Sequence, residues 1–121
     1  MSRNPAIRTV AMPADANAYG DIFGGWLMSL MDSGAGLMAA RRTKGRAVTV
    51  AMDGLAFHKP VKVGDEVSVY AEITSVGTTS MEISTDVFRR ERHSVEEELV
   101  TSAKFTFVAI DDAGKPRKIG D

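Results

Sequence analysis

The sequence predicts an α+β domain in which one long helix packs against an antiparallel sheet. Two observations predict it: one stretch of about twenty residues has a helical hydrophobic period, and the later apolar stretches have a period of two. Successive strands joined by short turns favour antiparallel pairing, and one helix of this length covers one face of such a sheet. A sheet wrapped around a central helix fits this pattern, and other α+β sandwiches fit it as well.

The amino-terminal third predicts a strand, a loop and the helix. Residues 7–12 form a β-prone run that ends at a proline, and residues 13–20 carry the Pro, Asp, Asn and Gly of a loop. From about residue 22 to residue 43 the spacing is helical, with apolar or small residues at i, i+3 and i+4. That stripe consists of Leu27, Leu30, Met31, Gly34, Ala35 and Met38.

Four residues in or beside this helix carry further expectations. Gly34 and Gly36 each cost ~1 kcal/mol relative to Ala in a helix, so we expect a neighbouring element to pack close to them. Asp21 is suited to cap the amino end of the helix, and Gly45 is suited to close its carboxyl end.

The rest of the chain predicts about four strands in succession. The first is almost entirely apolar and is expected to be buried on both faces, whereas the other three alternate apolar and polar residues. A charged connection, residues 89–98, joins the last two. The strands are expected at residues 47–57, 67–73, 81–87 and 103–109.

Length and composition predict one globular domain over residues 1–121. Of the 121 residues 44% are hydrophobic and 26% are charged, as in ordinary globular domains. A chain this short leaves much surface uncovered, which makes self-association a reasonable expectation. The formal net charge of -1 argues against a protein that binds nucleic acid through bulk charge.

Several classes of protein are excluded or disfavoured by what the sequence lacks. Without cysteine there is no disulfide, thiolate metal site or cysteine nucleophile. The first twelve residues do not resemble a signal peptide, and no apolar run approaches the ~18 residues of a membrane-spanning helix. We therefore expect a soluble, cytoplasmic protein with no membrane partner.

Gly24 and Gly25 open the predicted helix and are the first candidate site residues. The first N–H groups of a helix have no intrahelical partner and lie at the positive end of its dipole. Uncovered by side chains, they can bind an anion or a carbonyl oxygen that becomes an oxyanion during acyl transfer. The alternative is that the glycines only permit a tight turn.

Asp32 and Asn17 are candidates to act beside these N–H groups. Asp32 follows Gly25 by seven residues, about two helical turns, so the two lie on the same face of the helix. Alternatively, its carboxylate is bonded to Ser29 or Ser33. The Asn17 amide offers both donors and an acceptor, and its alternative role is to form a turn.

The combination of Asn17, Phe23-Gly24-Gly25 and Met31-Asp32 resembles the YciA-type branch of the hotdog acyl-CoA thioesterases, which belongs to the same broader group as the brain-type acyl-CoA hydrolases. The resemblance covers nearly the whole chain. The similar stretches are residues 11–17, 24–28, 31–32, 49–53, 57–65, 77–81 and 105–111.

This resemblance implies a hotdog fold and hydrolysis of acyl-CoA to a free fatty acid and coenzyme A. It implies that Gly25, with Gly24 beside it, polarises the thioester carbonyl and that Asp32 acts as general base or nucleophile. Asn17 is implied to come from the neighbouring subunit, in an active site at a dimer interface. The family often forms trimers of dimers, and no metal or cofactor is implied, because coenzyme A is part of the substrate.

Residues around the implied site are candidates to contact the substrate. Thr49 and Ala51 are expected on a strand that borders the site, unless they serve only sheet packing. Cations that could hold the phosphates of coenzyme A, if they are not simply solvated, are Lys59, Arg89, Arg90 and Arg92. The acyl pocket is expected to be lined by Ile22, Phe23, Trp26 and Met28.

One residue departs from the family pattern, and two other functions were weighed. Tyr19 stands where a smaller or polar residue is expected, so it is expected to reshape the acyl end of the pocket. A non-catalytic acyl-CoA sensor on the same fold would have little use for Asp32. A hotdog hydratase or dehydratase needs a histidine near the start of the helix, where neither His58 nor His93 lies in the sequence.

Overall fold

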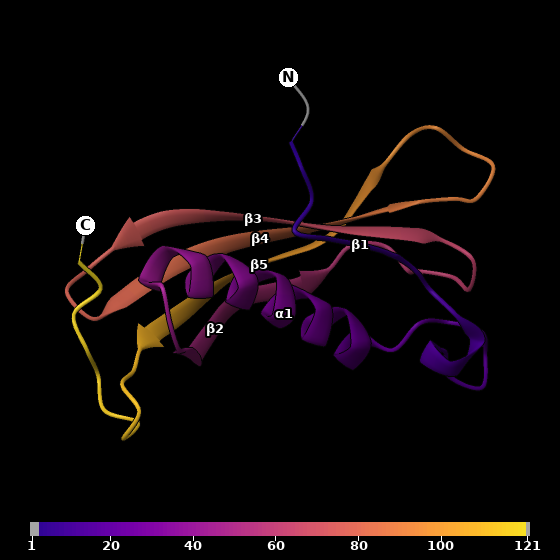
Figure 1. Cartoon of the computed structure of the whole chain (residues 1–121). Coiled ribbons are helices and arrows are strands. Elements are labelled where there is room, and N and C mark those ends of the chain that lie inside the picture. Colours follow the sequence, from indigo (N-terminus) through magenta and orange to yellow (C-terminus); the bar gives the residue numbers. More distant parts are fainter. Residues whose placement is uncertain (1–2, 121) are drawn as a thin grey trace.

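The computed structural model describes residues 3–120 and confirms the predicted architecture, one helix on a five-stranded antiparallel sheet (Figure 1). The sheet order is β1-β3-β4-β5-β2, so β1 and β2 lie at its two edges. A short 3-10 turn, η1, precedes the helix. The elements are β1 Ile7–Val10, η1 Pro13–Asp15, α1 Gly24–Thr43, β2 Ala47–Phe57, β3 Glu66–Val76, β4 Ser80–Arg90 and β5 Glu98–Ala109.

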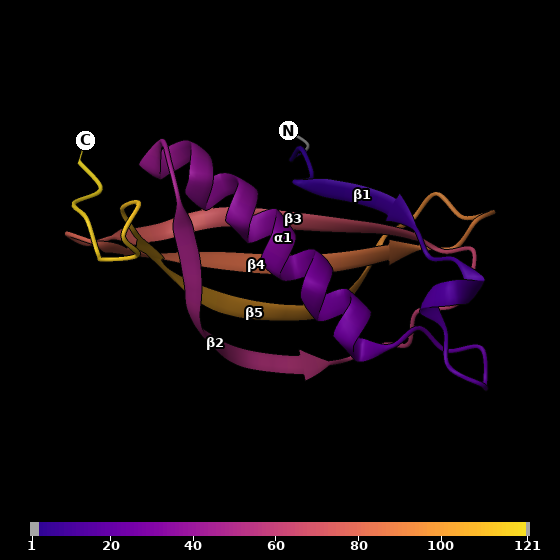
Figure 2. The ribbon, with the colours of Figure 1, turned by 60° about the horizontal axis from the view of Figure 1, so that its bottom comes forward.

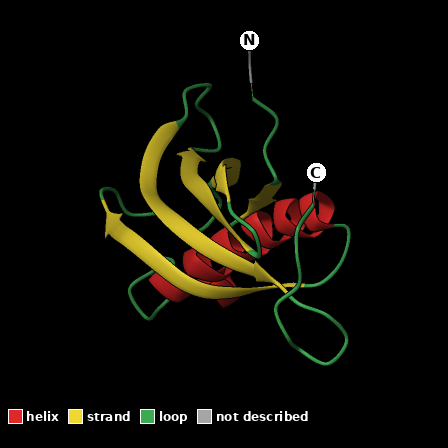
Figure 3. Ribbon diagram, turned by 90° about the vertical axis from the view of Figure 1, so that its left-hand side faces the viewer, coloured by secondary structure: helices red, strands yellow, loops and turns green. Residues whose placement is uncertain are grey.

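The core lies between α1 and the concave face of the sheet, which curls around the helix (Figures 2 and 3). The close approach expected at Gly34 and Gly36 is confirmed at Gly34 only, since a Cβ on Gly36 would lie no nearer than 3.8 Å to the ring of Phe107. A Cβ on Gly34 would lie 3.1 Å from Cγ1 of Val69 on β3. Glycine therefore destabilises the helix at this position but allows α1 to pack closely against β3. The helix-facing residues of the sheet include Val67, Val69, Ile83, Val87, Phe105 and Phe107.

The alternation predicted for the last three strands is confirmed, and the strands are longer than expected. Val69 pairs with Val87, and Ile83 pairs with both Ile73 and Phe105, so the apolar residues of neighbouring strands share the face that packs on α1. In the described part of the chain no helix is long and apolar enough to span a membrane.

The prediction that β2 is buried on both faces is wrong, because β2 is an edge strand paired only with β5. Val48 and Val50 are exposed, Val50 with 56% of its surface accessible. The apolar run was typical of a central strand, but strand order, not composition, decides which strand lies at the edge. Two irregularities interrupt its pairing, at Val50 and at Gly54, where φ is 76°.

The carboxyl end of α1 is closed differently from the expectation. Lys44, not Gly45, adopts the left-handed conformation of the cap, with φ 55°. Gly45 instead makes room for Arg117, since a Cβ there would lie 2.7 Å from a guanidinium nitrogen. Arg117 donates hydrogen bonds to the carbonyls of Thr43, Arg46 and Ile110, at 3.0, 3.2 and 2.8 Å.

Candidate functional site

The amino end of α1 has free backbone donors. Phe23 is the N-cap and no side chain caps the helix; the carbonyl of Phe23 accepts hydrogen bonds from the N–H groups of Trp26 and Leu27. Neither the N–H of Gly24 nor that of Gly25 has an acceptor within residues 3–120. The expected pair of open donors at the positive end of the helix dipole is therefore present.

The two glycines have different surroundings. The ring of Phe57, at the end of β2, packs against Gly24, where a Cβ would lie 3.2 Å from the nearest ring carbon. Around Gly25 a Cβ would meet nothing within 4 Å. A Cβ on Gly24 would therefore crowd the ring of Phe57, whereas Gly25 is exposed and leaves open space where its side chain would be.

Asp32 is exposed on α1 and is held by a neighbour on β2. The hydroxyl of Thr49 donates a short hydrogen bond to Oδ1 of Asp32, and Oδ2 has no partner among residues 3–120. The alternative bond to Ser29 is not formed, because the Ser29 hydroxyl donates to the carbonyl of Trp26. The rise of seven helical residues places Asp32 about 10 Å along the axis from Gly25 and on the same face.

Asn17 organises a tight loop before the helix, as its turn-forming role predicts. Its Oδ1 accepts hydrogen bonds from the N–H groups of Tyr19 and Asp21, at 2.9 and 3.1 Å. Its backbone N–H donates to the carbonyl of Asp21, and its own carbonyl accepts from Gly20. Because Oδ1 is used inside the loop, the side-chain group left to act on a ligand is the Nδ2 amino group.

The expectation that Asp21 caps α1 is wrong. Its carboxylate forms an ion pair with Lys62, and the backbones of the two residues also form a β-bridge. This contact ties the Asn17 loop to the segment before β3. Lys62 is thus a cation beside the candidate site that the sequence did not single out; only contacts across 41 residues of chain reveal it.

The structure separates the predicted substrate-contacting residues. Ile22 is buried in the core and offers almost no surface, whereas Phe23 is exposed and Trp26 and Met28 are partly buried. Ala51 does not share a face with Thr49, contrary to expectation. The irregularity at Val50 pairs Thr49 with Phe107 on the helix side and Ala51 with Thr106 on the outer side.

Arg89 lies on the helix side of β4, bound to carboxylates. Its side chain is 13% exposed and pairs with Asp65 at 3.1 Å and with Glu98 at 3.2 Å, and Glu98 also pairs with Lys59 at 3.4 Å. Burial lowers the pKa of Arg89, but its hydrogen bonds to Asp65 and Glu98 outweigh this effect and raise the pKa. The bond from Arg89, followed by the charge of Lys59, lowers the pKa of Glu98.

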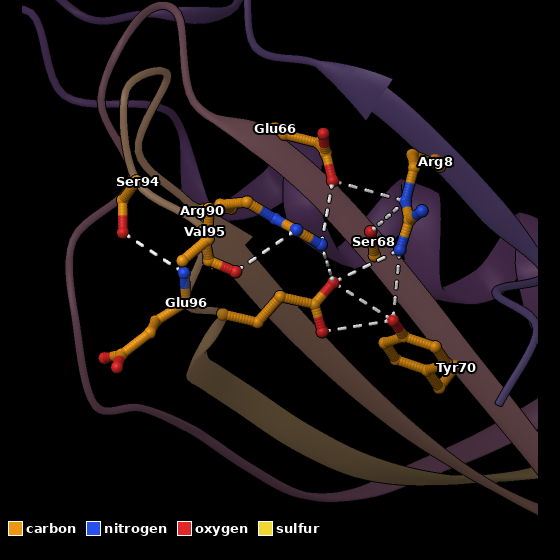
Figure 4. A network of polar contacts seen from close by, with 9 residues as sticks. Arg8, Glu66, Ser68, Tyr70, Arg90, Ser94, Val95 and Glu96 are labelled. Carbon is orange, nitrogen blue, oxygen red and sulfur yellow. Dashed lines mark hydrogen bonds and ion pairs between the residues drawn. The ribbon is translucent and has the colours of Figure 1, made fainter. Parts of the chain in front are cut away.

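Arg90 points to the opposite face of the sheet and joins a separate network (Figure 4). It pairs with Glu66 at 3.4 Å and Glu97 at 3.0 Å, and Arg8 pairs with the same two carboxylates. Residues 89 and 90 therefore cannot serve one phosphate site from one chain, because strand alternation directs them to different faces. Of the four predicted cations, Lys59 has half of its side chain exposed, and Arg92, just after the end of β4, is exposed as well and has no ion pair within residues 3–120.

Metal ligation has no support in the geometry. Within residues 3–120 no group of three His, Asp or Glu side chains could hold a metal ion. His58 and His93 are both exposed, and His58 directly follows Phe57.

Solved structures of similar proteins include thioesterases, among them alanine variants of one acyl-CoA hydrolase. The chain is 48% identical to a hexameric thioesterase from Yersinia pestis, with a TM-score of 0.93 over 98% of this chain and 96% of that one. It is 31% identical to an acyl-CoA hydrolase from Staphylococcus aureus, with a TM-score of 0.87 over 93% and 67%. Alanine variants of that hydrolase replace an asparagine, an aspartate and a threonine at intervals of 15 and 17 residues, the same intervals that separate Asn17, Asp32 and Thr49.

The sequence comparisons agree with the structural ones. Residues 19–96 match the family model of the thioesterase superfamily. The chain is 47% identical over 116 residues to the acyl-CoA thioester hydrolase YciA of Escherichia coli, covering 93% of this chain and 88% of that one. This chain therefore belongs to the hotdog-fold thioesterase superfamily, in its branch of YciA-type acyl-CoA thioester hydrolases.

Proposed function

We propose that this protein hydrolyses acyl-CoA thioesters to a free carboxylic acid and coenzyme A. The observation that carries the proposal is the pairing, on one face of α1, of an open Gly25 N–H with a carboxylate held by Thr49. The thioester carbonyl would lie at the amino end of the helix, where the free N–H donates to its oxygen. That donor becomes more effective as negative charge develops on the oxygen.

The reaction needs only a proton acceptor besides this donor. Asp32 takes a proton from water while the water oxygen attacks the carbonyl carbon. The carbon–sulfur bond then breaks, and coenzyme A leaves as a thiolate that is protonated by Asp32 or by solvent. A thiol of this kind has a pKa of ~8.5, so no strong general acid is required. In the other version of the mechanism Asp32 attacks the carbonyl itself and forms a mixed anhydride that water hydrolyses.

The hydrogen bond from Thr49 supports either version. It fixes one carboxylate oxygen of Asp32 and leaves the other to face water or the thioester. Thr49 is therefore a positioning residue. Holding the reacting carboxylate in one orientation removes a conformational cost from the chemical step.

The site is completed by a second chain in this proposal. The loop that holds residues 16–22 projects beyond the amino end of α1 (Figure 2), and the side chain of Asn17 is partly exposed. The unpaired edge of β2, with Val48 and Val50 exposed, is suited to pair with the same edge of another copy. Hexameric relatives support a trimer of dimers, in which Asn17 of one chain donates to the substrate held at Asp32 of its partner.

The coenzyme A moiety is assigned to the helix side of the sheet. Lys59 and Arg92 are the phosphate contacts that the geometry favours, because the side chain of Lys59 is half exposed with an accessible partner, Glu98, and Arg92 is exposed without an ion pair within residues 3–120. Arg89 and Arg90 would first have to leave their carboxylates. The acyl chain is assigned to the exposed and partly buried apolar residues at the amino end of α1, Phe23, Trp26 and Met28.

Release of free thiol from acyl-CoAs of several chain lengths tests the proposal. We expect turnover by the wild type and a loss of at least ~10²-fold in kcat for Asp32→Ala, with substrate binding retained. Asp112→Ala is the matched control, since Asp112 is an exposed aspartate in the turn after β5. Binding without thiol release by the wild type at every chain length would instead identify an acyl-CoA sensor, and a hydrated product with the thioester intact would identify a hydratase.

A further inference from the structure

The turn before β3 is bonded to both ends of the segment that leads from β1 into α1. After β1, the backbone N–H of Ala11 donates to the carbonyl of Asp65 at 2.9 Å. Just before α1, the backbone N–H of Ile22 donates to the carbonyl of Val61 at 2.9 Å. The 61–65 turn therefore fixes both where the chain leaves β1 and where it enters the helix.

The carboxylate of Asp65 holds this turn in shape and ties it to β4. Its Oδ2 accepts the N–H of Lys62 at 3.0 Å, and the N–H of Asp65 donates to the carbonyl of Lys62 at 3.1 Å. The same Oδ2 accepts a hydrogen bond from Nη1 of Arg89 at 3.1 Å. Hydrogen bonds to an ionised acceptor are about twice as strong as neutral ones, so this oxygen is a firm anchor for the 61–65 turn.

The pair of Asp65 and Arg89 is buried, with side chains 7% and 13% exposed. A second ion pair, between Asp21 and Lys62, also joins the turn to the segment before α1, but its side chains are 41% and 54% exposed. Solvent screens an exposed pair, whereas a buried pair holds its partners in place because breaking it leaves a charge in the interior. The buried pair is therefore the one that keeps the turn in a single position.

The end of α1 that the 61–65 turn holds is the end with the open donor. Ile22, whose N–H is bonded to Val61, is buried in the core and precedes the N-cap Phe23 by one residue. From Ile22 to Gly25 the chain spans at most ~11 Å, so a displacement of the turn is passed to the first turn of the helix. The position of Ile22 therefore sets where the N–H of Gly25 lies relative to the sheet.

We propose that Asp65 and Arg89 are positioning residues for thioester hydrolysis: through the 61–65 turn they fix the amino end of α1 where the N–H of Gly25 meets the thioester carbonyl. This inference rests on the proposed function, in which that N–H is the donor. Neither side chain touches the substrate in this role. Arg89 therefore acts on the helix, through Asp65, and not on a phosphate of coenzyme A.

The test variant has to remove the pair without leaving an unpaired charge in the interior. The double variant Asp65→Asn, Arg89→Met does so, and its asparagine keeps an oxygen that accepts the N–H of Lys62. We expect kcat to fall by about 10–10²-fold with KM nearly unchanged, because a displacement of ~1 Å at the reacting groups costs up to that factor. A rise in KM alone would overturn the proposal.

The matched control makes the same two substitutions in an ion pair on the other face of the sheet, Asp86→Asn with Arg3→Met. Its kcat should stay at the wild-type value, measured at a temperature at which circular dichroism shows each protein to be folded. An equal loss in the control would show that the effect comes from a general loosening of the sheet, and would overturn the positioning role.

Two further readouts separate positioning from other roles. The N–H resonance of Gly25 should shift in the double variant, whereas that of Gly36 in the middle of α1 should not. The fold loss in kcat should be the same for an acyl-pantetheine, which carries the thioester but no phosphate, as for the acyl-CoA. A loss confined to acyl-CoA would make Arg89 a phosphate contact and overturn the proposal.

Asp65→Asn alone decides the question if the double variant does not fold, because Arg89 then keeps Glu98 as its charged partner at 3.2 Å. We expect kcat to fall about threefold, since a neutral acceptor holds the guanidinium less strongly than a charged one. The Gly25 resonance should shift with it, and no change in either would overturn the role of the pair.

The failures of the two proposals are distinguishable. A folded double variant with the kcat of the wild type would overturn the role of Asp65 and Arg89 and leave the proposed function standing. A wild-type protein that releases no thiol from any acyl-CoA overturns the proposed function, and the inference about the pair with it.

Discussion

The two ends of α1 satisfy their backbone groups in opposite ways. At the carboxyl end, the N–H groups of Lys44 and Gly45 donate to the carbonyl of Ala40, and Arg117 donates to the carbonyl of Thr43 in the last turn and to that of Arg46 just after it. At the amino end, neither Gly24 nor Gly25 has an acceptor for its N–H within residues 3–120, and no side chain caps the helix.

This contrast supports the proposal that the substrate binds at the amino end of α1. Every helix begins with unpaired N–H groups and ends with unpaired carbonyls, and leaving either set without partners costs free energy. Here the chain brings an arginine from beyond the last strand to the carbonyl end, while it leaves the donor end open beside Asp32. Donors that are left open, at the positive end of the dipole, are the ones available to a substrate oxygen.

The largest effect is expected from removing the open donor itself. Gly25→Pro deletes one N–H in the first helical turn, where proline is tolerated. We expect kcat to fall by about 10²–10³-fold, as for the loss of one oxyanion donor. Gly25→Ala keeps the N–H and has room for its Cβ, so it is the matched control. Equal activity of the two variants, with helix content unchanged by circular dichroism, would show that this N–H is not the donor.

The hydrogen bonds of Arg117 at the carboxyl end of α1 should matter for stability and not for catalysis. Arg117→Met removes the hydrogen bonds to Thr43, Arg46 and Ile110 but keeps an apolar stem. We expect the free energy of unfolding to fall by about 2–4 kcal/mol, because carbonyls lose a charged donor. Denaturant melts measure this loss, and kcat at low temperature should stay near the wild-type value. Lys118→Met is the control, since Lys118 is exposed.

A smaller effect on kcat is expected from removing the hydrogen bond that holds the carboxylate of Asp32. Thr49→Val removes the hydroxyl that bonds Asp32 with little change in shape. One hydrogen bond to a charged group is worth ~1.5 kcal/mol, which corresponds to about tenfold in kcat with KM nearly unchanged. Thr49→Ser keeps the donor and should recover most of the rate. A rise in KM alone, in both variants, would assign Thr49 to substrate binding.

Local patterns in the sequence were sufficient for the elements and for much of the site. The period of 3.6 located α1 to within two residues, and the seven-residue spacing placed Asp32 on the face of Gly25. Both rest on helix geometry, which depends only on neighbours along the chain. The alternation in β3, β4 and β5 is equally local, since each strand buries one face.

What the sequence did not predict depends on contacts between distant segments. The edge position of β2 follows from strand order, and the irregularity at Val50 turns Ala51 away from Thr49. Asp21 pairs with Lys62 and does not cap the helix. Arg117, which had no expected role, reaches carbonyls about 70 residues away. None of these arrangements leaves a periodic signal in the chain.

The smallest effect expected is one of pH on the ion pairs near the open end, where Lys59 follows Phe57 by two residues. Arg89, and then Lys59, lower the pKa of Glu98 below its ordinary value of 4.5. A lowered pKa in the folded state means that Glu98 stabilises the protein above pH 4.5, and that this contribution is lost as the pH falls through the folded-state value.

Wild type should therefore lose more stability on acidification from pH 6 than Glu98→Gln, and the two should converge in strong acid. The difference should be small, because the pair with Lys59 is half exposed. If the free energies of unfolding of the two proteins fell in parallel with pH and never converged, Glu98 would stabilise the protein through packing and not through its charge. The carboxylates near the open end would then be no more than solvated neighbours of the site.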